Sequence, residues 1–187
     1  DKHYPDAVVY VADATHLEKH LLLLTQLLDL NLPVVLALNM SDTAAQIGIK
    51  VHAAKLTERL GIPVLMVSGR TGENIPRLLG EIEKLIHTPP SKRKSFYSIS
   101  ETEKQITEAV CLNLNISSPY AALLIAHHHI WLPFLTSQQS STIATIVQNK
   151  GFSSLKNQVD ETLERYDRFT PIVQDSVQRP PQFPSTP

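Results

Sequence analysis

The sequence predicts an α/β fold, with a parallel sheet covered by helices in the first half of the chain and a small all-α domain in the second half. Three short apolar runs, each followed by a helical segment, indicate the sheet. The runs are apolar throughout, as strands buried on both faces of a parallel sheet usually are. Beyond residue 99 no strand pattern follows, which favours a helical domain there.

The first predicted strand and helix lie at the amino end. Residues 6–13 (DAVVYVAD) form a β-branched run that ends at Asp13, as a buried strand would. Thr15 and Glu18 have the spacing of a capping box, so we expect a helix over residues 16–30. One stripe of that helix should face the core, formed by Leu17, Leu21, Leu24 and Leu28.

Two further strand and helix pairs follow. Residues 34–38 are the second predicted strand, and residues 52–60 favour a short helix that ends at Gly61. Residues 64–67 form the third strand, and residues 72–87 an amphipathic helix. The apolar positions of this last helix are Ile75, Leu78, Leu79, Ile82, Leu85 and Ile86.

The predicted domain boundaries follow changes in composition. Residues 1–88 carry the sheet, 89–98 a linker, 99–178 the helical domain and 179–187 a proline-rich tail. We interpret the basic cluster of the linker as a solvated hinge, formed by Lys92, Arg93 and Lys94. The expected helices are 101–113, one opened by Ser118-Pro119, 141–149, 154–168 and one over 171–178 opened by Thr170-Pro171. On the fourth, one apolar face is formed by Leu155, Val159, Leu163 and Tyr166.

Composition excludes several classes of function. The net charge of −1 gives no basic field for nucleic acid, so we expect no nucleic-acid partner. A single cysteine, Cys111, excludes an internal disulfide framework. Apolar runs are shorter than the roughly 20 residues of a membrane span, and no signal peptide opens the sequence, so we expect a soluble chain.

Two groups of histidines lie close together in the sequence, but neither predicts a metal site. Residues 127–129 are consecutive on a helix and point about 100° apart, so they cannot share one ion. His16 and His20 are four positions apart, but no third ligand accompanies them. We therefore expect these side chains to be structural, and we assign no metal ligand or catalytic residue.

Polar residues follow the second strand, where ligands bind in parallel sheets. A carboxylate at Asp42 can accept two parallel N–H bonds, which a guanine edge offers and an adenine edge does not. Asn39 could contact the base or tie loops together, and Met40 could lie against the base plane. The alternative is that Ser41 or Asp42 simply caps the next helix.

A second polar loop follows the third strand and favours the ligand interpretation. Backbone N–H groups of Ser68, Gly69 and Arg70 could donate to the guanine oxygen, and Gly69 would let the backbone approach closely. Ser68 has no His-Asp partner that would indicate a nucleophile. Two polar loops at neighbouring strand ends, with a helix between them, have the order that a purine site needs.

These residues resemble a known family. Residues 39–42 (NMSD) resemble the fourth signature motif of G-domain GTPases, Asn-Lys-x-Asp, and residues 68–70 resemble the fifth, Ser-Ala-Lys/Arg. The order NMSD, GIKV, LGIPV is similar to the G domain of ferrous iron transport protein B, in which methionine replaces the lysine, as Met40 does here. Residues 95–178 resemble its helical, nucleotide-dissociation-inhibitor-like domain. The implied fold is a partial P-loop-GTPase-type (Rossmann-like) parallel sheet followed by that helical domain.

The resemblance implies a GTP- or GDP-binding iron transporter, and this chain departs from the family in two ways. Gly69 stands where the family more often has alanine, which is tolerable because the backbone makes the contact. No G-x-x-x-x-G-K-[ST] or Asp-x-Pro-Gly motif is present, so the phosphate and Mg²⁺ ligands are absent and we expect no hydrolysis by this chain alone. We expect very weak guanine-nucleotide binding.

The resemblance also implies partners. They are the missing amino-terminal half of the G domain and the permease domain of the same protein, at the cytoplasmic face of the bacterial inner membrane, and a homo-oligomer is possible. The missing strand would lie against the first one, which leaves an apolar edge uncovered at Val8, Val9 and Val11.

Two other functions stay open from the sequence. The chain could be a non-catalytic, G-domain-like interaction module that binds no nucleotide. A third option is another translation- or membrane-linked GTPase, against which Met40 and the helical domain argue.

Overall fold

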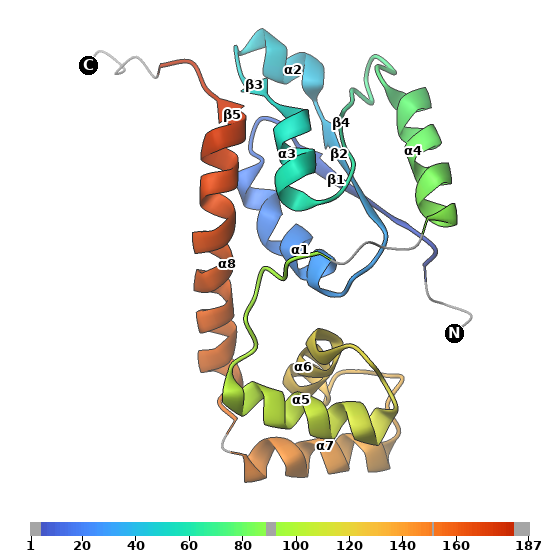
Figure 1. Ribbon diagram of the computed structural model, residues 1–187, viewed down its shortest axis with the longest axis vertical. Coiled ribbons are helices and arrows are strands. Elements are labelled where there is room, and N and C mark those ends of the chain that lie inside the picture. Colours follow the sequence, from blue (N-terminus) through green and yellow to red (C-terminus); the bar gives the residue numbers. More distant parts are fainter. Residues whose placement is uncertain (1–4, 89–92, 151, 182–187) are drawn as a thin grey trace. The chain divides into compact units, whose positions relative to one another are not determined.

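The computed structural model describes residues 5–88, 93–150 and 152–181. The chain forms two compact units (Figure 1). The first unit comprises Asp1–Phe96 together with Arg165–Pro187, and the second comprises Tyr97–Glu164. The first contains the sheet, and the second is helical, so the predicted fold class is confirmed.

A parallel sheet lies at the centre of the first unit. Its strands β1 (Val8–Asp13), β2 (Val34–Asn39) and β4 (Val64–Met66) occur in the order β1-β2-β4. Asp13 is paired in register with Asn39, so the ends of β1 and β2 lie together. Because β2 and β4 are also parallel, the loops that follow them lie side by side at the carboxyl ends of the strands, as the sequence predicts.

Strand β1 lies at the edge of this sheet. No second strand pairs with it within the described residues. Val9 and Val11 expose 38% and 57% of their surface, and Val8 is half-buried. The predicted uncovered apolar edge is therefore present.

Helices cover both faces of the sheet (Figure 1). The leucine stripe of α1 (Glu18–Asp29) is buried together with Leu56 and Leu60 of α3 (Ala53–Leu60). The other face packs against Leu78 of α4 (Ile75–His87). The prediction for α4 is partly wrong, because Leu79 and Ile86 are 61% and 50% exposed. They lie on the outer side of a helix that has one packing face.

The predicted capping box of α1 is absent. Thr15 donates both its N–H and its Oγ1–H to Asp13 Oδ1, each at 2.7 Å. Leu17 occupies the N-cap position, without a side-chain cap, and the helix begins at Glu18. The carboxylate at the end of β1 binds the threonine hydroxyl in a local turn, which competes with capping.

A short helix and two short strands complete the first unit. Helix α2 (Ser41–Gln46) follows β2, and β3 (Lys50–Val51) pairs antiparallel with β5 (Val177–Gln178). No local pattern predicts this pairing, since each strand has two residues and they are far apart in the chain. The predicted helix over 171–178 is accordingly wrong at its carboxyl end.

Helix α8 (Ser154–Ser176) runs without a break through Pro171. The prediction of a new helix opened by Thr170-Pro171 is therefore wrong. Proline within a helix removes one hydrogen bond and costs about 3 kcal/mol. Burial compensates for this, because three neighbours belong to the core of the sheet unit, namely Phe169, Ile172 and Val173. Residues from Arg165 onward consequently group with the sheet, whereas the predicted helical domain extended to residue 178.

The second unit contains α5 (Glu101–Leu114), α6 (Pro119–His128), α7 (Ser137–Asn149) and the first part of α8. Its core is formed by Ile106, Val110, Ala122, Ala126 and Ile143. Ser118 caps α6 as predicted, since its Oγ accepts from the Ala121 N–H at 3.2 Å. The apolar face predicted for α8 does not contribute to a core, because its four residues are 42–78% exposed, namely Leu155, Val159, Leu163 and Tyr166.

A membrane span requires length as well as apolarity. Within the described residues no single helix has both. Helices α5 and α6, with a bend of 91° between them, meet the requirement as a pair by length and composition.

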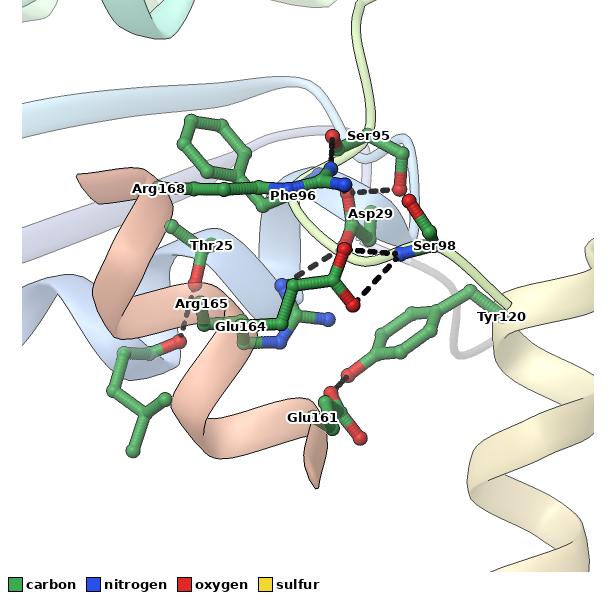
Figure 2. A network of polar contacts seen from close by, with 11 residues as sticks. Thr25, Asp29, Ser95, Phe96, Ser98, Tyr120, Glu161, Glu164, Arg165 and Arg168 are labelled. Carbon is green, nitrogen blue, oxygen red and sulfur yellow. Dashed lines mark hydrogen bonds and ion pairs between the residues drawn. The ribbon is translucent and has the colours of Figure 1, made fainter. Parts of the chain in front are cut away.

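A buried ion pair joins α1 to α8 within the first unit. Arg165 Nη1 lies 2.8 Å from Asp29 Oδ2, and both side chains are almost fully buried. Asp29 Oδ1 also accepts from Ser95 Oγ at 2.9 Å and from the Phe96 N–H at 2.8 Å, as Figure 2 shows. Arg168 Nη1 donates to the Ser95 carbonyl at 2.7 Å. Asp29 therefore fixes both the incoming linker and the carboxyl half of α8.

The described part of the predicted linker is not a solvated hinge throughout. Arg93 is half-buried and donates from Nη2 to the Leu32 carbonyl at 2.6 Å. Lys94 is exposed, as expected, and Lys92 lies outside the described residues. Charge clustering predicts solvation on average, but a guanidinium can pack its stem and bond a carbonyl at the same time.

Candidate functional site

The first loop of the site turns sharply at Met40. Asn39 ends β2, and Met40 adopts a left-handed conformation, with φ of 64°. This conformation is unusual for a bulky residue with a side chain, and such strained residues occur at ligand-binding loops as well as in turns. It directs the chain into α2, and the Ser41 N–H then donates to the Val67 carbonyl at 3.1 Å. Met40 itself is 39% exposed.

The second loop folds onto itself after β4. The Gly72 N–H donates to the Ser68 carbonyl at 2.8 Å, and the Thr71 N–H donates to Ser68 Oγ at 3.2 Å. Asn74 Nδ2 donates to the Met66 carbonyl at 2.8 Å. Ser68 is almost fully buried. The loop is thus held by its own backbone before it meets any ligand.

Three contacts tie the two loops together. The Gly69 N–H donates to Asn39 Oδ1 at 3.0 Å, and Ser41 Oγ donates to Glu73 Oε2 at 2.9 Å. Arg70 donates from Nε to Asp42 Oδ2 at 2.7 Å and contacts the same oxygen with Nη2. The structure therefore brings all six predicted site residues together at the carboxyl ends of β2 and β4.

Glycine is not required at position 69 by close packing. A Cβ atom there would lie 3.6 Å from Asn39 Oδ1, which is an ordinary contact distance. Its φ is not in the left-handed region either. The substitution of glycine for the family's alanine is therefore neutral for this geometry.

Arg70 stabilises the ionised form of Asp42. Its hydrogen bond lowers the pKa of the Asp42 carboxyl below the ordinary value, with a smaller contribution from the Ser68 hydroxyl. An aspartate is ionised at neutral pH even with its ordinary pKa, so the ion pair chiefly orients an acceptor that is charged in any case. The Arg70 side chain is 69% exposed, so its guanidinium can leave the carboxylate without disturbing a core.

Glu73 is a site residue that sequence reasoning missed. It accepts from Ser41 across 32 sequence positions, and Ser68 and Glu73 also form an isolated antiparallel bridge. The hydrophobic periodicity and turn residues around Ser41 and Glu73 do not predict a contact between two residues so far apart in the sequence. Ser41, predicted only as an alternative cap, instead links the loops.

The histidine groups have local partners. His16 Nδ1 lies 2.8 Å from Thr15 Oγ1 and 3.3 Å from Asp13 Oδ2. His127 Nδ1 lies 2.8 Å from Ser154 Oγ, and burial lowers the pKa of His127. His16 and His127 therefore each have a side-chain partner within the protein.

The donor and acceptor set fits one edge of a guanine base. Asp42 supplies a carboxylate acceptor for ring N–H and amine groups, and the second loop carries backbone N–H donors such as that of Arg70. The Asn39 oxygen already accepts from Gly69, which leaves its amide nitrogen as a donor. No P-loop motif occurs in the sequence, so these residues could hold a base but not the phosphates or Mg²⁺.

Sequence comparisons point to one family. The family model for ferrous iron transport protein B matches residues 2–82. The Fe(2+) transporter FeoB of Staphylococcus aureus (strain MSSA476) is 34% identical over 161 residues, which are 84% of this chain and 23% of that protein. The FeoB of Legionella pneumophila (strain Paris) is 38% identical over 101 residues, covering 54% of this chain and 13% of that protein. The chain thus spans less than a quarter of the length of these relatives.

Solved structures of FeoB cytosolic domains share the fold. The cytosolic domain of L. pneumophila FeoB is similar with a TM-score of 0.72 and 25% identity, covering 94% of this chain and 69% of that one. The GMPPNP form of the T. maritima FeoB cytosolic domain gives 0.65 at 22% identity, with coverage of 95% and 69%. A GDP-bound point mutant of the S. thermophilus FeoB G-domain gives 0.65 at 24% identity, with coverage of 95% and 71%.

Proposed function

Because this chain belongs to the ferrous iron transport protein B family, we propose that it carries the guanine-recognition half of a GTP-binding domain together with a helical regulatory module. The observation that supports this most is the convergence of Asn39, Asp42 and the 68–70 loop, tied by direct contacts, at the carboxyl ends of β2 and β4. In parallel sheets, ligands bind at the carboxyl ends of the strands.

Each site residue has a distinct role in the proposal. Asp42 accepts from the ring N–H and the exocyclic amine of guanine, and Met40 packs on the base. Asn39 holds the second loop through Gly69 and presents its amide nitrogen to the base. The Arg70 backbone N–H donates to the base oxygen, and a bound base would have to share the Gly69 N–H with Asn39.

Hydrolysis needs residues that this sequence does not contain. Phosphate positioning and Mg²⁺ supply most of the chemistry of GTP hydrolysis, and no P-loop or Asp-x-Pro-Gly motif is present. We propose that this chain alone binds guanine nucleotide weakly and does not hydrolyse it. Mg²⁺ would enter with the complementary half of the G domain.

The proposed partner for the sheet edge is that complementary half. It would pair along β1, whose Val9 and Val11 are exposed. We further propose that the helical module passes nucleotide state to the membrane permease at the cytoplasmic face, where ferrous iron is the transported substrate. A homo-oligomer is compatible with the same exposed edge.

A second function is favoured by one observation. Arg70 already occupies an oxygen of Asp42, so a chain in which this ion pair never opens would be a G-domain-like interaction module without a nucleotide. The two proposals differ in whether guanine can displace the guanidinium.

Amide chemical shifts in solution separate the two proposals. Titration of the chain with GDP should shift the amides of residues 39–42 and 68–70 at millimolar concentrations, whereas ADP should leave them unchanged. Equal responses to GDP and ADP, or no response to either, would favour the interaction module. For variants that remove the Asp42 carboxylate, the matched control is Asp160→Asn, which replaces an exposed aspartate of the second unit.

A further inference from the structure

A second concave site lies in the first unit, away from the loops of the base site. It is a cavity of about 660 Å³ bordered by the end of α3, residues 93–96 and the carboxyl half of α8. Gly61 in its wall precedes β4, whereas Ser68 of the base site follows β4. The two sites therefore lie at opposite ends of this strand. The volume is within the range of small-molecule sites, about 300–1,000 Å³.

Cations dominate the polar lining of this cavity. Four of its lining residues are basic and one is acidic, Glu58. The basic residues are Arg59, Arg93, Lys94 and Arg168. This excess is local, because the whole chain has a net charge of −1. Converging cations with low-dielectric walls attract anions and focus the field on them.

Within the described residues, two of these cations, Arg93 and Arg59, are incompletely neutralised. Arg93 donates to the neutral Leu32 carbonyl at 2.6 Å, and its buried Nε has no hydrogen-bond partner among the described residues. Burial lowers the pKa of Arg93, and the nearby Asp29 carboxylate, which opposes this lowering, is already paired with Arg165 at 2.8 Å. Arg59 pairs with Asp175 at 3.1 Å, but both side chains are at least half exposed, so this pair is weak and readily exchanged.

The floor of the cavity is apolar. It is formed by Leu60, Phe96, Pro171 and Ile172, of which three are buried by more than nine-tenths. A bare inorganic anion would leave this surface uncovered. A ligand that fits both features carries an anionic group next to an apolar body, and arginine forks are matched to phosphate oxygens in particular.

We propose that this cavity binds a phosphate monoester with an apolar body, which the basic residues hold by its phosphate and the apolar floor by its body. Such a ligand would contact the 93–96 segment and α8 together. Since both are fixed by Asp29, occupancy would stabilise the carboxyl half of α8 on the sheet unit. Two sources offer this chemistry, a soluble phosphorylated metabolite and an anionic lipid.

The test uses 1-naphthyl phosphate as the probe on the whole chain. We expect it to shift the amides of Gly61 and Phe96 and to bind at least tenfold more tightly than either 1-naphthol or inorganic phosphate. The double variant Arg59→Gln/Lys94→Gln should weaken this binding at least tenfold. Both side chains are exposed, so the variant should fold. Lys19→Gln, an exposed lysine of α1, is the matched control and should bind as the wild type does.

Vesicles distinguish the two sources. Co-sedimentation with phosphatidylcholine vesicles that contain phosphatidic acid, lost in the double variant, would support the site with a lipid ligand. Binding of 1-naphthyl phosphate without co-sedimentation would support it with a soluble ligand. The proposal is overturned if the probe leaves Gly61 and Phe96 unshifted, or if the double variant binds it as tightly as Lys19→Gln does.

Discussion

Arg70 and Asp42 form an ion pair across the two loops of the base site, with Arg70 Nε 2.7 Å from Asp42 Oδ2. The pair has two consequences for the proposed function. It lowers the pKa of the Asp42 carboxyl and orients the carboxylate toward the second loop. It also occupies an acceptor that guanine would need, so base binding and the ion pair compete.

Removal of the guanidinium should expose this competition. In Arg70→Gln, we expect guanosine to bind several-fold more tightly, because Asp42 no longer has to release a cation. Isothermal or chemical-shift titration would measure the change, with Arg77→Gln, an exposed arginine of α4, as the control. Weaker binding in Arg70→Gln than in the control would show that Arg70 instead orients the carboxylate for the base.

Acid should open the same ion pair. The pKa of folded Asp42 lies below the ordinary value of 3.8, and Arg70 is the largest cause of the lowering. The stabilisation is therefore fully present above that ordinary value and is lost as the pH falls through the folded pKa. A carboxyl-carbon NMR titration should give a lowered pKa in the wild type and a value closer to 3.8 in Arg70→Gln. Identical titrations would contradict the pairing in solution.

Backbone strain at Met40 gives a separate prediction. A left-handed residue with a side chain costs about 1–2 kcal/mol, and glycine avoids this cost. We expect Met40→Gly to leave the free energy of unfolding unchanged or to raise it by up to about 1 kcal/mol. The control Ala45→Gly, within α2, should lower it by roughly 0.5–1 kcal/mol. Urea denaturation measures both, and equal losses would contradict the left-handed turn.

The buried ion pair of Arg165 and Asp29 should be costly to break. Loss of one partner leaves an uncompensated buried charge, so Arg165→Met should lower the free energy of unfolding of the first unit by about 3–5 kcal/mol. The exposed pair of Arg59 with Asp175 is the control, and Arg59→Met should cost under about 1 kcal/mol. A similar small loss in both variants would rule out a structural role for the buried pair.

The uncovered edge of the sheet should promote self-association. Val11 is 57% exposed on β1, an edge strand whose outer side has no strand partner within the described residues, and a lysine there blocks edge-to-edge pairing at little cost. In sedimentation velocity, Val11→Lys should shift the chain toward monomer relative to the wild type. Leu23→Lys, which replaces a similarly exposed leucine of α1, should not. An equal effect of both lysines would assign the association to general hydrophobicity.

Much of the first unit followed from the sequence because its signals are local. Continuous apolar strands, the leucine stripe of α1 and the glycine stop of α3 at Gly61 all appear where periodicity and turn chemistry place them. The edge position of β1 followed from the family's strand order. These features depend on neighbours within a few residues or on a known topology.

The incorrect predictions concern contacts between distant residues. The Thr170-Pro171 pattern predicts a helix start, but the burial of Phe169 and Ile172 against the sheet keeps α8 continuous. The basic cluster of the linker predicts a solvated Arg93, but this side chain donates a hydrogen bond to the Leu32 carbonyl, 61 positions away. Sequence reasoning also selected Asp42 and Arg70 for the site, but it could not show that their side chains pair with each other.

The specificity of Asp42 tests the central proposal most directly. Asparagine at this position keeps the size of the side chain but offers one acceptor and one donor. Xanthine carries an oxygen in place of the guanine amine, so Asp42→Asn should prefer xanthosine to guanosine. The wild type and Asp160→Asn should prefer guanosine.

Chemical-shift titration of residues 39–42 and 68–70 with the two nucleosides makes this measurement. A reversed preference in Asp42→Asn is the expected result. The same preference in Asp42→Asn and in the wild type would contradict the proposal that guanine binds at the carboxyl ends of β2 and β4.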